Sequence, residues 1–306
     1  MRPLAAIDVG TNTVLMVVGH CGTDGAIEIL DDAHAIARMG RGVDEDGRIQ
    51  DDRIDRVCQI VEGYHERAKA FGIERICAFG TSALRDATNK EAIISAVAER
   101  ADVELVELSG ADEAGLTFRG AAFGLELPSR FAVLDIGGGS TELAIGTESG
   151  GVEESNSVDV GAVRVTERFF GLLPPGRAEQ EAAATMITEQ LKRLPQVDTD
   201  APLVGVAGTV TTLGAFDTQA ASFDDDAING HQLSIEAISD ISADLLQMDY
   251  AQIRAISQIN EQRADIITAG ALILKQFLLH RGYAQLTVST RGIRYGLLLD
   301  MIDGKR

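Results

Sequence analysis

The chain has 306 residues, a formal net charge of −20 and 45% apolar residues, which fits a globular protein with more than one domain. This acidity argues against binding to nucleic acid or to anionic membranes, since both attract an excess of Lys and Arg. No apolar run is long enough to span a bilayer, and Asp8 and Asn12 interrupt the stretch that a signal peptide would keep apolar. Three cysteines without metal-ligand spacing are typical of a reduced compartment, so we expect a cytoplasmic protein with no nucleic-acid or membrane partner.

The first part of the chain is predicted to combine a β-meander with helices. Its opening segment reads as three short strands, and a helical period follows over residues 51–71. Next come a strand, the loop "GTSALRDATN", a helix opened by a capping-box pattern at Thr88 and Glu91, another strand and another helix. These elements are expected at residues 4–9, 14–19, 26–30, 51–71, 75–79, 90–100, 102–110 and 111–124.

The second part of the chain repeats this layout. A second meander is followed by two helical patterns, by the strand, glycine turn and helix of "APLVGVAGTVTTLG", and by the strand, loop and terminal helix of "QLTVSTRGIRYGLLLDMI". The meander and the two helical patterns are expected at residues 131–136, 141–145, 152–158, 174–194 and 235–246. Strands followed by helices in each half predict an α/β fold with mixed sheets, in two domains over residues 1–125 and 126–306.

The two meanders read as copies of each other at an offset of 127 residues, which separates Asp8 from Asp135. "AAIDVGTNTVLMVVG" and "AVLDIGGGSTELAIG" each place a turn of small or hydroxyl residues after an apolar strand that carries an aspartate. Glycine lets the backbone approach a ligand closely, and successive N–H groups of such a turn can converge on an anion. The residues expected to bind phosphate here are Gly10, Thr11, Asn12, Thr13, Gly137, Gly138, Gly139, Ser140 and Thr141.

Carboxylates beside these turns indicate a metal ion. Asp135 and Glu142 offer the hard oxygen ligands that magnesium accepts, and Asp8 offers a second carboxylate from the first copy. A carboxylate beside a phosphate cradle makes sense only with a cation between them, so we expect Mg²⁺, with Mn²⁺ as the alternative. The structural alternative is a glycine-rich hairpin selected only for its turn.

A third phosphate-type element is "GVAGTVTTL", in which Gly208 and Thr209 end a strand and begin a helix whose amino terminus favours anions. Two phosphate hairpins followed by such an element resemble the actin-like superfamily, which includes sugar kinases and chaperone ATPases.

Two further motifs carry chemistry. In "GTSALRDATN", Thr81 and Ser82 are expected to bind phosphate. Arg85 follows them, and a guanidinium there can hold phosphate oxygens or stabilise charge during phosphoryl transfer; a solvated surface arginine is the alternative. In "LSGADEAGL", Ser109 can cap a helix whose first turn carries Asp112, with Glu113 just beyond. Either acid is a candidate general base for an attacking water, and the residues alone leave that choice open.

The ordered motifs resemble those of one enzyme family. "AAIDVGTNTVLMVV", "GTSALRDATN", "LSGADEAGL", "VLDIGGGSTELAIG", "VAGTVTTL", "INGHQLS", "RADIITAGALIL" and "STRGIRYGLLL" are similar to the motif series of the exopolyphosphatase and guanosine pentaphosphate phosphohydrolase family, over nearly the whole chain. The resemblance implies two actin-like (ribonuclease H-like) domains with the active site in the cleft between them. The chain is similar to the short members of this family, which lack a carboxyl-terminal helical extension.

The resemblance also implies residue roles. Glu113 takes the place of the catalytic base and Arg85 that of the phosphate-binding arginine, while Asp8 faces the second domain's ligands, which fall on Asp135, Gly137, Ser140 and Glu142. Two positions depart from the family pattern. Asp112 stands where the family has a glutamate, and Tyr295, which follows Arg294, stands where many members have an acid.

We therefore predict a magnesium-dependent exopolyphosphatase that hydrolyses the terminal phosphoanhydride of inorganic polyphosphate. Short to medium chains are favoured because the acidic protein repels a long polyanion, and guanosine pentaphosphate is the alternative substrate. A kinase or ATPase of the same superfold is a different enzyme class. The departures at Asp112 and Tyr295 leave open a sensor that binds polyphosphate or guanosine tetraphosphate without cleavage. The resemblance further implies a homodimer.

Overall fold

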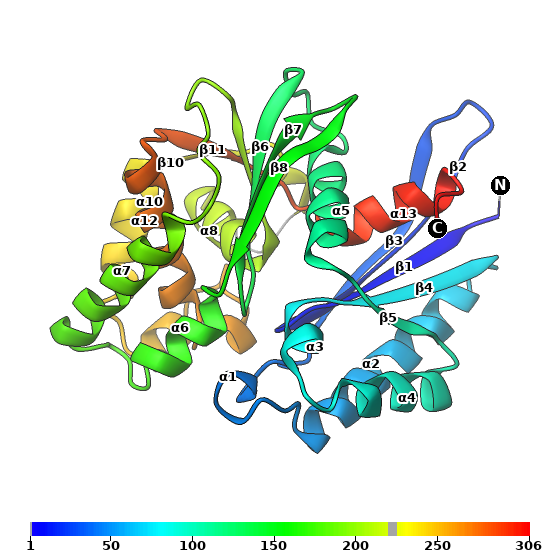
Figure 1. The fold of residues 1–306 in the computed structure, drawn as a ribbon, viewed down its shortest axis with the longest axis horizontal. Coiled ribbons are helices and arrows are strands. Elements are labelled where there is room, and N and C mark those ends of the chain that lie inside the picture. The colour runs from blue at the N-terminus through cyan, green and yellow to red at the C-terminus, as the bar shows by residue number, and fades with distance from the viewer. Residues whose placement is uncertain (1, 220–224) are drawn as a thin grey trace. The chain divides into compact units, whose positions relative to one another are not determined.

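The computed structural model describes residues 2–219 and 225–306. Contacts within the chain divide it into two compact units (Figure 1): unit 1 comprises Met1–Gly120 and Ile293–Arg306, and unit 2 comprises Ala121–Gly292. The predicted second domain, residues 126–306, included the terminal helix. In the structure this helix, α13 (Ile293–Ile302), packs on the first two strands of unit 1, so the last part of the chain groups with the beginning.

Unit 1 is built on a five-stranded mixed sheet. In chain order the strands are β1 (Leu4–Val9), β2 (Thr13–Cys21), β3 (Ile27–Ile36), β4 (Arg75–Gly80) and β5 (Leu105–Glu107). They lie in the order β3-β2-β1-β4-β5, with β2 antiparallel to both of its neighbours and β4 parallel to both of its own. This is the strand order of a ribonuclease H-like domain, as predicted.

Helices cover both faces of this sheet. They are α1 (Val43–Asp46), α2 (Asp51–Lys69), α3 (Ser82–Asp86), α4 (Lys90–Ala101), α5 (Gly110–Ala122) and α13. α2 and α4 share an apolar core with Ala5, Ile7 and Val9 of β1, and α13 lies on the opposite face (Figure 1). Because successive side chains of a strand point to opposite faces, Asp8 points away from α2 and α4, toward the face that α13 covers.

Unit 2 has a six-stranded mixed sheet. Its strands are β6 (Arg130–Ile136), β7 (Thr141–Thr147), β8 (Gly151–Val158), β9 (Leu203–Val206), β10 (Gln232–Ser234) and β11 (Gln285–Val288). The order is β10-β11-β9-β6-β7-β8, with β7 antiparallel to β6 and β9 parallel to β6. Read from β8 to β11, unit 2 repeats the order of unit 1 and adds β10 at one edge.

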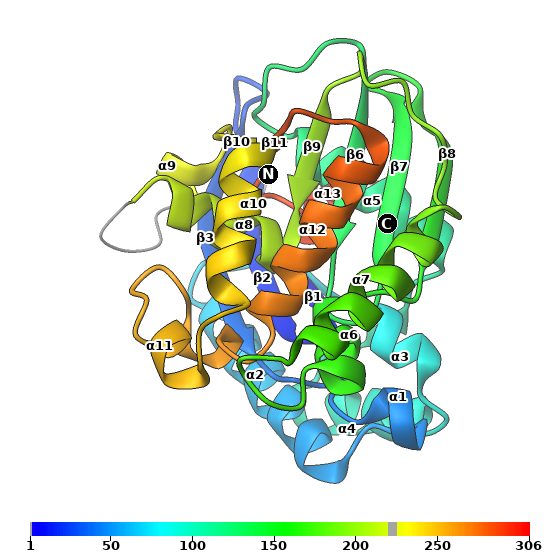
Figure 2. The ribbon, with the colours of Figure 1, turned by 90° about the vertical axis from the view of Figure 1, so that its left-hand side faces the viewer.

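Helices of unit 2 bury the apolar side of its sheet, and Figure 2 shows α7, α10 and α12 in front of the strands. The helical segments are α6 (Ala162–Phe169), α7 (Arg177–Leu191), α8 (Ala207–Asp217), α9 (Asp225–Ile228), α10 (Ile235–Leu245), α11 (Tyr250–Arg254), the 3₁₀ turn η1 (Glu261–Arg263) and α12 (Ile267–Arg281). Over residues 2–219 and 225–306, none of the helices combines the length and the apolar content that crossing a bilayer requires.

The internal repeat is confirmed as a structural duplication. Asp8 pairs with Leu15 across the first hairpin, and Asp135 pairs with Glu142 across the second. Both hairpins are therefore closed by a turn of four residues, at 10–13 and at 137–140. The copies differ in one chemically important place, because Leu15 occupies the position that Glu142 has in unit 2.

α4 begins at Lys90, as predicted, but its capping differs from the prediction. The capping-box pattern placed the N-cap at Thr88, but the N-cap is Asn89, and Thr88 Oγ1 donates a hydrogen bond to Gly47 O at 2.8 Å. The side chain of Asn89 accepts from Ile49 N and donates to Ile49 O, both at 2.9 Å. A tertiary contact with the loop before α2 has thus replaced the local cap.

α5 and α13 touch backbone to backbone, which leads to a stability prediction. A Cβ on Gly296 would stand 1.9 Å from Leu116 O, so Gly296→Ala must push these helices apart. Overpacking of this kind destabilises by about 1–3 kcal/mol, and we expect a lower midpoint of thermal unfolding.

The matched control for Gly296→Ala is Gly63→Ala in α2, where a Cβ would meet nothing within 4 Å. A mid-helix alanine there should stabilise by about 0.5–1 kcal/mol. Calorimetry of both variants checks the pair, and an unchanged midpoint for Gly296→Ala would contradict the close contact.

Candidate active site

Asp8 is a buried carboxylate beside the first glycine turn. It is 7% exposed, and its Oδ1 has no hydrogen-bond partner among the described residues. A Cβ on Gly10 would stand 4.0 Å from this oxygen, which places the carboxylate next to the turn. The pKa of Asp8 is raised from 3.8 to about 8, mainly by burial and also by the charge of Glu113, while Arg294 acts in the opposite direction. An uncompensated buried acceptor of this kind fits a cation ligand.

The first turn is anchored through its carbonyl groups. Gly40 N donates to Thr11 O at 2.8 Å, and the N–H groups of Ala37 and Arg38 both donate to Asn12 O at 3.0 Å. In a trans peptide the next N–H points opposite to the carbonyl, so the N–H groups that follow Thr11 and Asn12 face away from segment 37–40. The side-chain Nδ2 of Asn12 is also buried, without a partner among the described residues. These donors are suited to phosphate oxygens.

The second turn is held in the same manner by the start of α6. Ala162 N donates to Gly137 O at 3.0 Å, Val163 N donates to Gly138 O at 2.9 Å, and Arg164 Nε donates to Gly139 O at 2.8 Å. Contact at Gly161 is so close that a Cβ there would lie 2.3 Å from Gly138 O. The N–H groups of this turn therefore face away from α6, and the glycines serve both the turn and its support.

The other predicted ligands of unit 2 differ in role. Ser140 is buried beside the turn. Glu142 accepts a hydrogen bond from Ser157 Oγ at 2.6 Å, which orients its carboxylate. Thr141, predicted to bind phosphate, is fully buried and donates its hydroxyl to Val160 O at 2.5 Å, so its role here is structural.

The metal set Asp8, Asp135 and Glu142 stays a prediction, since its members belong to two units. In the part of the chain that the structure describes, no three His, Cys, Asp or Glu side chains gather as a metal site. The chemistry of the three carboxylates nevertheless fits Mg²⁺ or Mn²⁺, which prefer oxygen ligands.

Arg85 and Glu113 form an ion pair in unit 1. Arg85 Nη1 donates to Glu113 Oε2 and, at 3.2 Å, to Leu108 O at the end of the loop before α5. Thr81 and Ser82, both buried, begin the short helix α3 that carries Arg85. Glu113 is 12% exposed, and burial raises its pKa although Arg85 lowers it. The sequence named both residues but gave no sign that they would pair.

The structure separates the two candidate bases that the sequence left open. Ser109 Oγ accepts from Asp112 N at 3.1 Å, which confirms the predicted cap, and donates to Asp112 Oδ2 at 2.7 Å. The hydrogen bond from Ser109 lowers the pKa of Asp112, whose side chain is 50% exposed. Glu113 has the higher pKa and the drier surroundings, which makes it the better proton acceptor near neutral pH.

Arg294 and Tyr295 of α13 converge on Asp32 of β3. Arg294 donates from Nε to Asp32 Oδ1 at 3.0 Å and from Nη2 to Asp32 Oδ2 at 2.8 Å, while Tyr295 OH donates to Asp32 Oδ2 at 2.6 Å. The guanidinium also lies 4.8 Å from the centre of the Tyr295 ring. Tyr295, noted as a departure from the family pattern, thus fixes the arginine whose charge acts on Asp8. Asp32 was not identified from the sequence, which predicted its strand to end at residue 30.

In unit 2 an arginine lies at the amino terminus of α8. A Cβ on Gly208 would stand 1.3 Å from Arg263 Nη1, and burial lowers the pKa of Arg263 to about 10. A guanidinium and a helix amino terminus are both electropositive, so their contact favours an anion beside them. Thr209 is buried, and a Cβ on Gly270 of α12 would stand 2.6 Å from its Oγ1; its phosphate-binding role stays a prediction. Arg263 was part of the quoted motif "RADIITAGALIL", but its position over Gly208 required the tertiary structure.

The raised pKa of Asp8 predicts a pH-dependent stability. Without divalent cations the folded chain keeps a proton on Asp8 up to about pH 8, whereas the unfolded chain releases it near its ordinary value of 3.8. Folding therefore binds a proton in this window, and the free energy of unfolding falls as pH rises, by at most about 1.4 kcal/mol per pH unit.

Asp8→Asn removes this dependence. In a chelating buffer, urea unfolding should show the variant more stable than the parent at pH 8, with the difference closing toward pH 4. Parallel curves for the two proteins would contradict the burial of the carboxylate.

Comparison with known proteins identifies one family. The model of the Ppx/GppA phosphatase family matches residues 18–305. Exopolyphosphatase 2 of Mycobacterium tuberculosis is 33% identical, over 97% of this chain and 98% of its own. The solved Ppx/GppA family member of Aquifex aeolicus is 28% identical with a TM-score of 0.83, over 100% of this chain and 99% of its own. An exopolyphosphatase of Cytophaga hutchinsonii, 24% identical over 99% and 98%, has a TM-score of 0.88 and shows the same fold.

These matches agree with the family that the ordered motifs resemble. The family model spans almost the whole chain. The matched residues include segment 37–40 and α6, which hold the two glycine turns, the Arg85–Glu113 pair, and Asp32 with its partners Arg294 and Tyr295. The chain belongs to the Ppx/GppA phosphatase family.

Proposed function

We propose that the chain is an exopolyphosphatase, which hydrolyses the terminal phosphoanhydride of inorganic polyphosphate and releases orthophosphate. The observation that carries this proposal is the buried Arg85–Glu113 pair at the same face of unit 1 as Asp8. Family membership and the name of the M. tuberculosis relative support it. Short to medium chains are preferred, and guanosine pentaphosphate is the alternative substrate.

Glu113 acts as the general base. Water attacks the terminal phosphorus, and Glu113 takes a proton from it as the new P–O bond forms. The P–O bond to the rest of the chain breaks, so orthophosphate and a polyphosphate shortened by one residue result. Arg85 holds the carboxylate through Nη1, and its positive charge offsets negative charge that develops on the transferred group.

Backbone N–H groups supply most of the hydrogen bonds to the phosphate. The outward N–H groups of turns 10–13 and 137–140, together with Asn12 Nδ2, offer donors that need no rearrangement, because segment 37–40 and α6 fix the turns from behind. Arg263 adds a fixed positive charge at Gly208. Preorganised donors of this kind stabilise charge better than water does, since they need not reorient during the reaction.

Asp8, Asp135 and Glu142 are the residues that would hold Mg²⁺. A bound magnesium ion supplies a Lewis acid that neutralises phosphate oxygens. The cleft between the two domains, the homodimer and a cytoplasmic location also remain proposals. Size-exclusion chromatography with light scattering measures the molar mass in solution and so tests the homodimer.

Glu113→Gln tests the proposed chemistry. Loss of the base should lower kcat about 10²–10⁴-fold while the affinity for polyphosphate changes little. Released orthophosphate is measured with magnesium for long polyphosphate, tripolyphosphate, guanosine pentaphosphate and ATP. The matched control is Glu91→Gln, an exposed glutamate of α4, which should retain parental rates.

The panel also separates the alternatives. Cleavage of guanosine pentaphosphate alone would replace the polyphosphate assignment. Absence of any cleavage, with one ligand bound tightly, would make the chain a sensor. Phosphorylation of an acceptor by ATP would make it a kinase.

Arg263→Gln tests the anion site in unit 2. Removal of this charge should raise KM for tripolyphosphate about tenfold, as expected when one charge-assisted contact worth about 1.4 kcal/mol is lost. Arg254→Gln is the control, because Arg254 forms an exposed ion pair with Glu261 in the same unit. Equal KM values for both variants would remove Arg263 from the phosphate site.

A further inference from the structure

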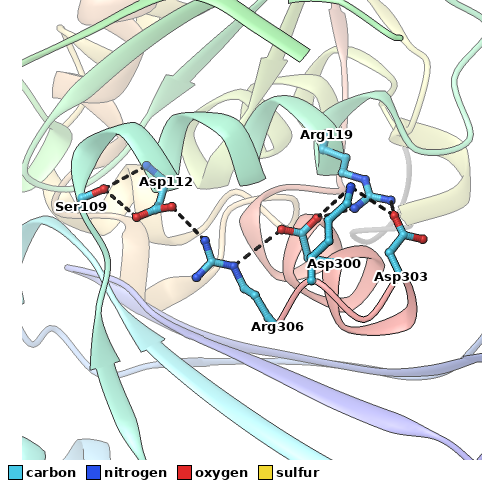
Figure 3. Close-up of polar contacts among 7 residues, drawn as sticks. Ser109, Asp112, Arg119, Asp300, Asp303 and Arg306 are labelled. Carbon is cyan, nitrogen blue, oxygen red and sulfur yellow. Dashed lines mark hydrogen bonds and ion pairs between the residues drawn. The ribbon is translucent and has the colours of Figure 1, made fainter. Parts of the chain in front are cut away.

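Arg306, which follows α13, makes contacts with three elements of unit 1, and Figure 3 shows those with Asp112 and Asp300. Its Nη2 lies 2.9 Å from Asp112 Oδ1 and its Nε lies 3.6 Å from Asp300 Oδ2. The guanidinium also lies 5.6 Å from the centre of the Phe79 ring. One side chain therefore joins the first turn of α5, the end of α13 and the strand β4.

One of these elements, α5, carries Glu113, and another, β4, leads into the helix that carries Arg85. Asp112 immediately precedes Glu113 in the first turn of α5, where Ser109 caps both the backbone and the carboxylate of Asp112. Phe79 lies in β4, which ends at Gly80 and leads into α3 with Arg85. Arg306 thus contacts the helix that carries Glu113 and the strand that leads to Arg85, without touching either proposed catalytic side chain.

Arg306 is held by Asp300, which is itself paired with Arg119. Asp300 of α13 receives Arg306 and also a hydrogen bond from Arg119, further along α5 (Figure 3). Arg119 Nη2 in turn lies 2.7 Å from Asp303 Oδ2. α5 is therefore tied to the end of α13 at two places, through Asp112 before Leu116 and through Arg119 after it, where Leu116 is the residue of α5 that Gly296 approaches.

We infer that Arg306 is a positioning residue for the reaction, which acts through Asp112 to hold the first turn of α5 so that Glu113 stays on Arg85. The inference rests on the proposed function for the role of Glu113. It also explains what Asp112 does: its carboxylate receives Ser109 and Arg306 and takes no proton from water. A pair as exposed as this one contributes modestly, so about a two- to fivefold effect on kcat is expected.

The test is a double-mutant cycle with Arg306→Gln and Asp112→Asn. Each single variant should lower kcat for tripolyphosphate about two- to fivefold and leave KM unchanged, and the double variant should be no slower than either single one. Lys305→Gln is the matched control. It removes the same charge from the same segment, and Lys305 pairs with Asp300 and Asp303 but not with Asp112. Lys305→Gln should keep the parental kcat.

Hydrogen exchange gives a readout that does not depend on activity. Amides of the first turn of α5 should exchange faster in Arg306→Gln than in the parent, and at the parental rate in Lys305→Gln. Thermal unfolding confirms that all variants are folded. If the parent cleaves no polyphosphate, the proposed function fails, while the exchange result still decides whether Arg306 holds this turn.

The positioning role is overturned by any of three results. Multiplicative losses in the double variant would show that Arg306 and Asp112 act separately. An equal loss of kcat in Lys305→Gln would show a general effect of charge. Unchanged exchange in the first turn of α5 in Arg306→Gln would show that the turn does not depend on this contact.

Discussion

The burial of two carboxylates, Asp8 and Glu113, is the constraint that the charged residues of unit 1 around them have to meet. Asp8 and Glu113 both lie out of water, and the charge of Glu113 raises the pKa of Asp8 beyond the effect of burial alone. Isolated buried charges are costly, so each needs a positive partner nearby. Arg85 forms an ion pair with Glu113. The positive charge of Arg294 acts on Asp8, and Asp32 holds Arg294 in place. Among the described residues, Asp8 Oδ1 has no hydrogen-bond partner, so a bound cation there would offset the charge of this carboxylate.

The two glycine turns show how backbone geometry is matched to anion binding. Turning a row of N–H groups toward a ligand leaves the carbonyls pointing the other way, and buried carbonyls need donors. Segment 37–40 supplies them in unit 1, and the amino-terminal N–H groups of α6 supply them in unit 2. In the second case the donors of a helix start, which have no partner within their own helix, satisfy the acceptors of the turn. The same solution appears twice, with unrelated segments, because the duplication preserved the turn and its requirement.

How much of this was readable from the sequence depends on where the partner of each residue lies. β1 was predicted with its observed bounds, and the Ser109 cap was identified, because strand alternation and capping are local patterns. Asp32 was missed because apolar alternation stops before it. β3 continues to Ile36 because it pairs with β2, and Asp32 on this segment meets Arg294, 262 residues away in sequence. The capping box at Thr88 was wrong for the same reason, since Gly47 competes for the hydroxyl. Local patterns gave the elements, whereas the pairing of charges between them required the fold.

The net negative charge of the chain repels the proposed anionic substrate at long range, whereas positive groups of the proposed site attract it at short range. A net charge of −20 slows the approach of a polyanion, but at physiological ionic strength this repulsion is screened beyond about 8 Å. Within unit 1, the guanidinium of Arg85, which we propose to act at the phosphate, is only partly exposed, so solvent and salt weaken its short-range attraction much less. The balance therefore penalises long polyanions, which spread their charge over the acidic surface. The proposed preference for a substrate with few phosphates follows, since such a substrate places less of its charge over the acidic surface.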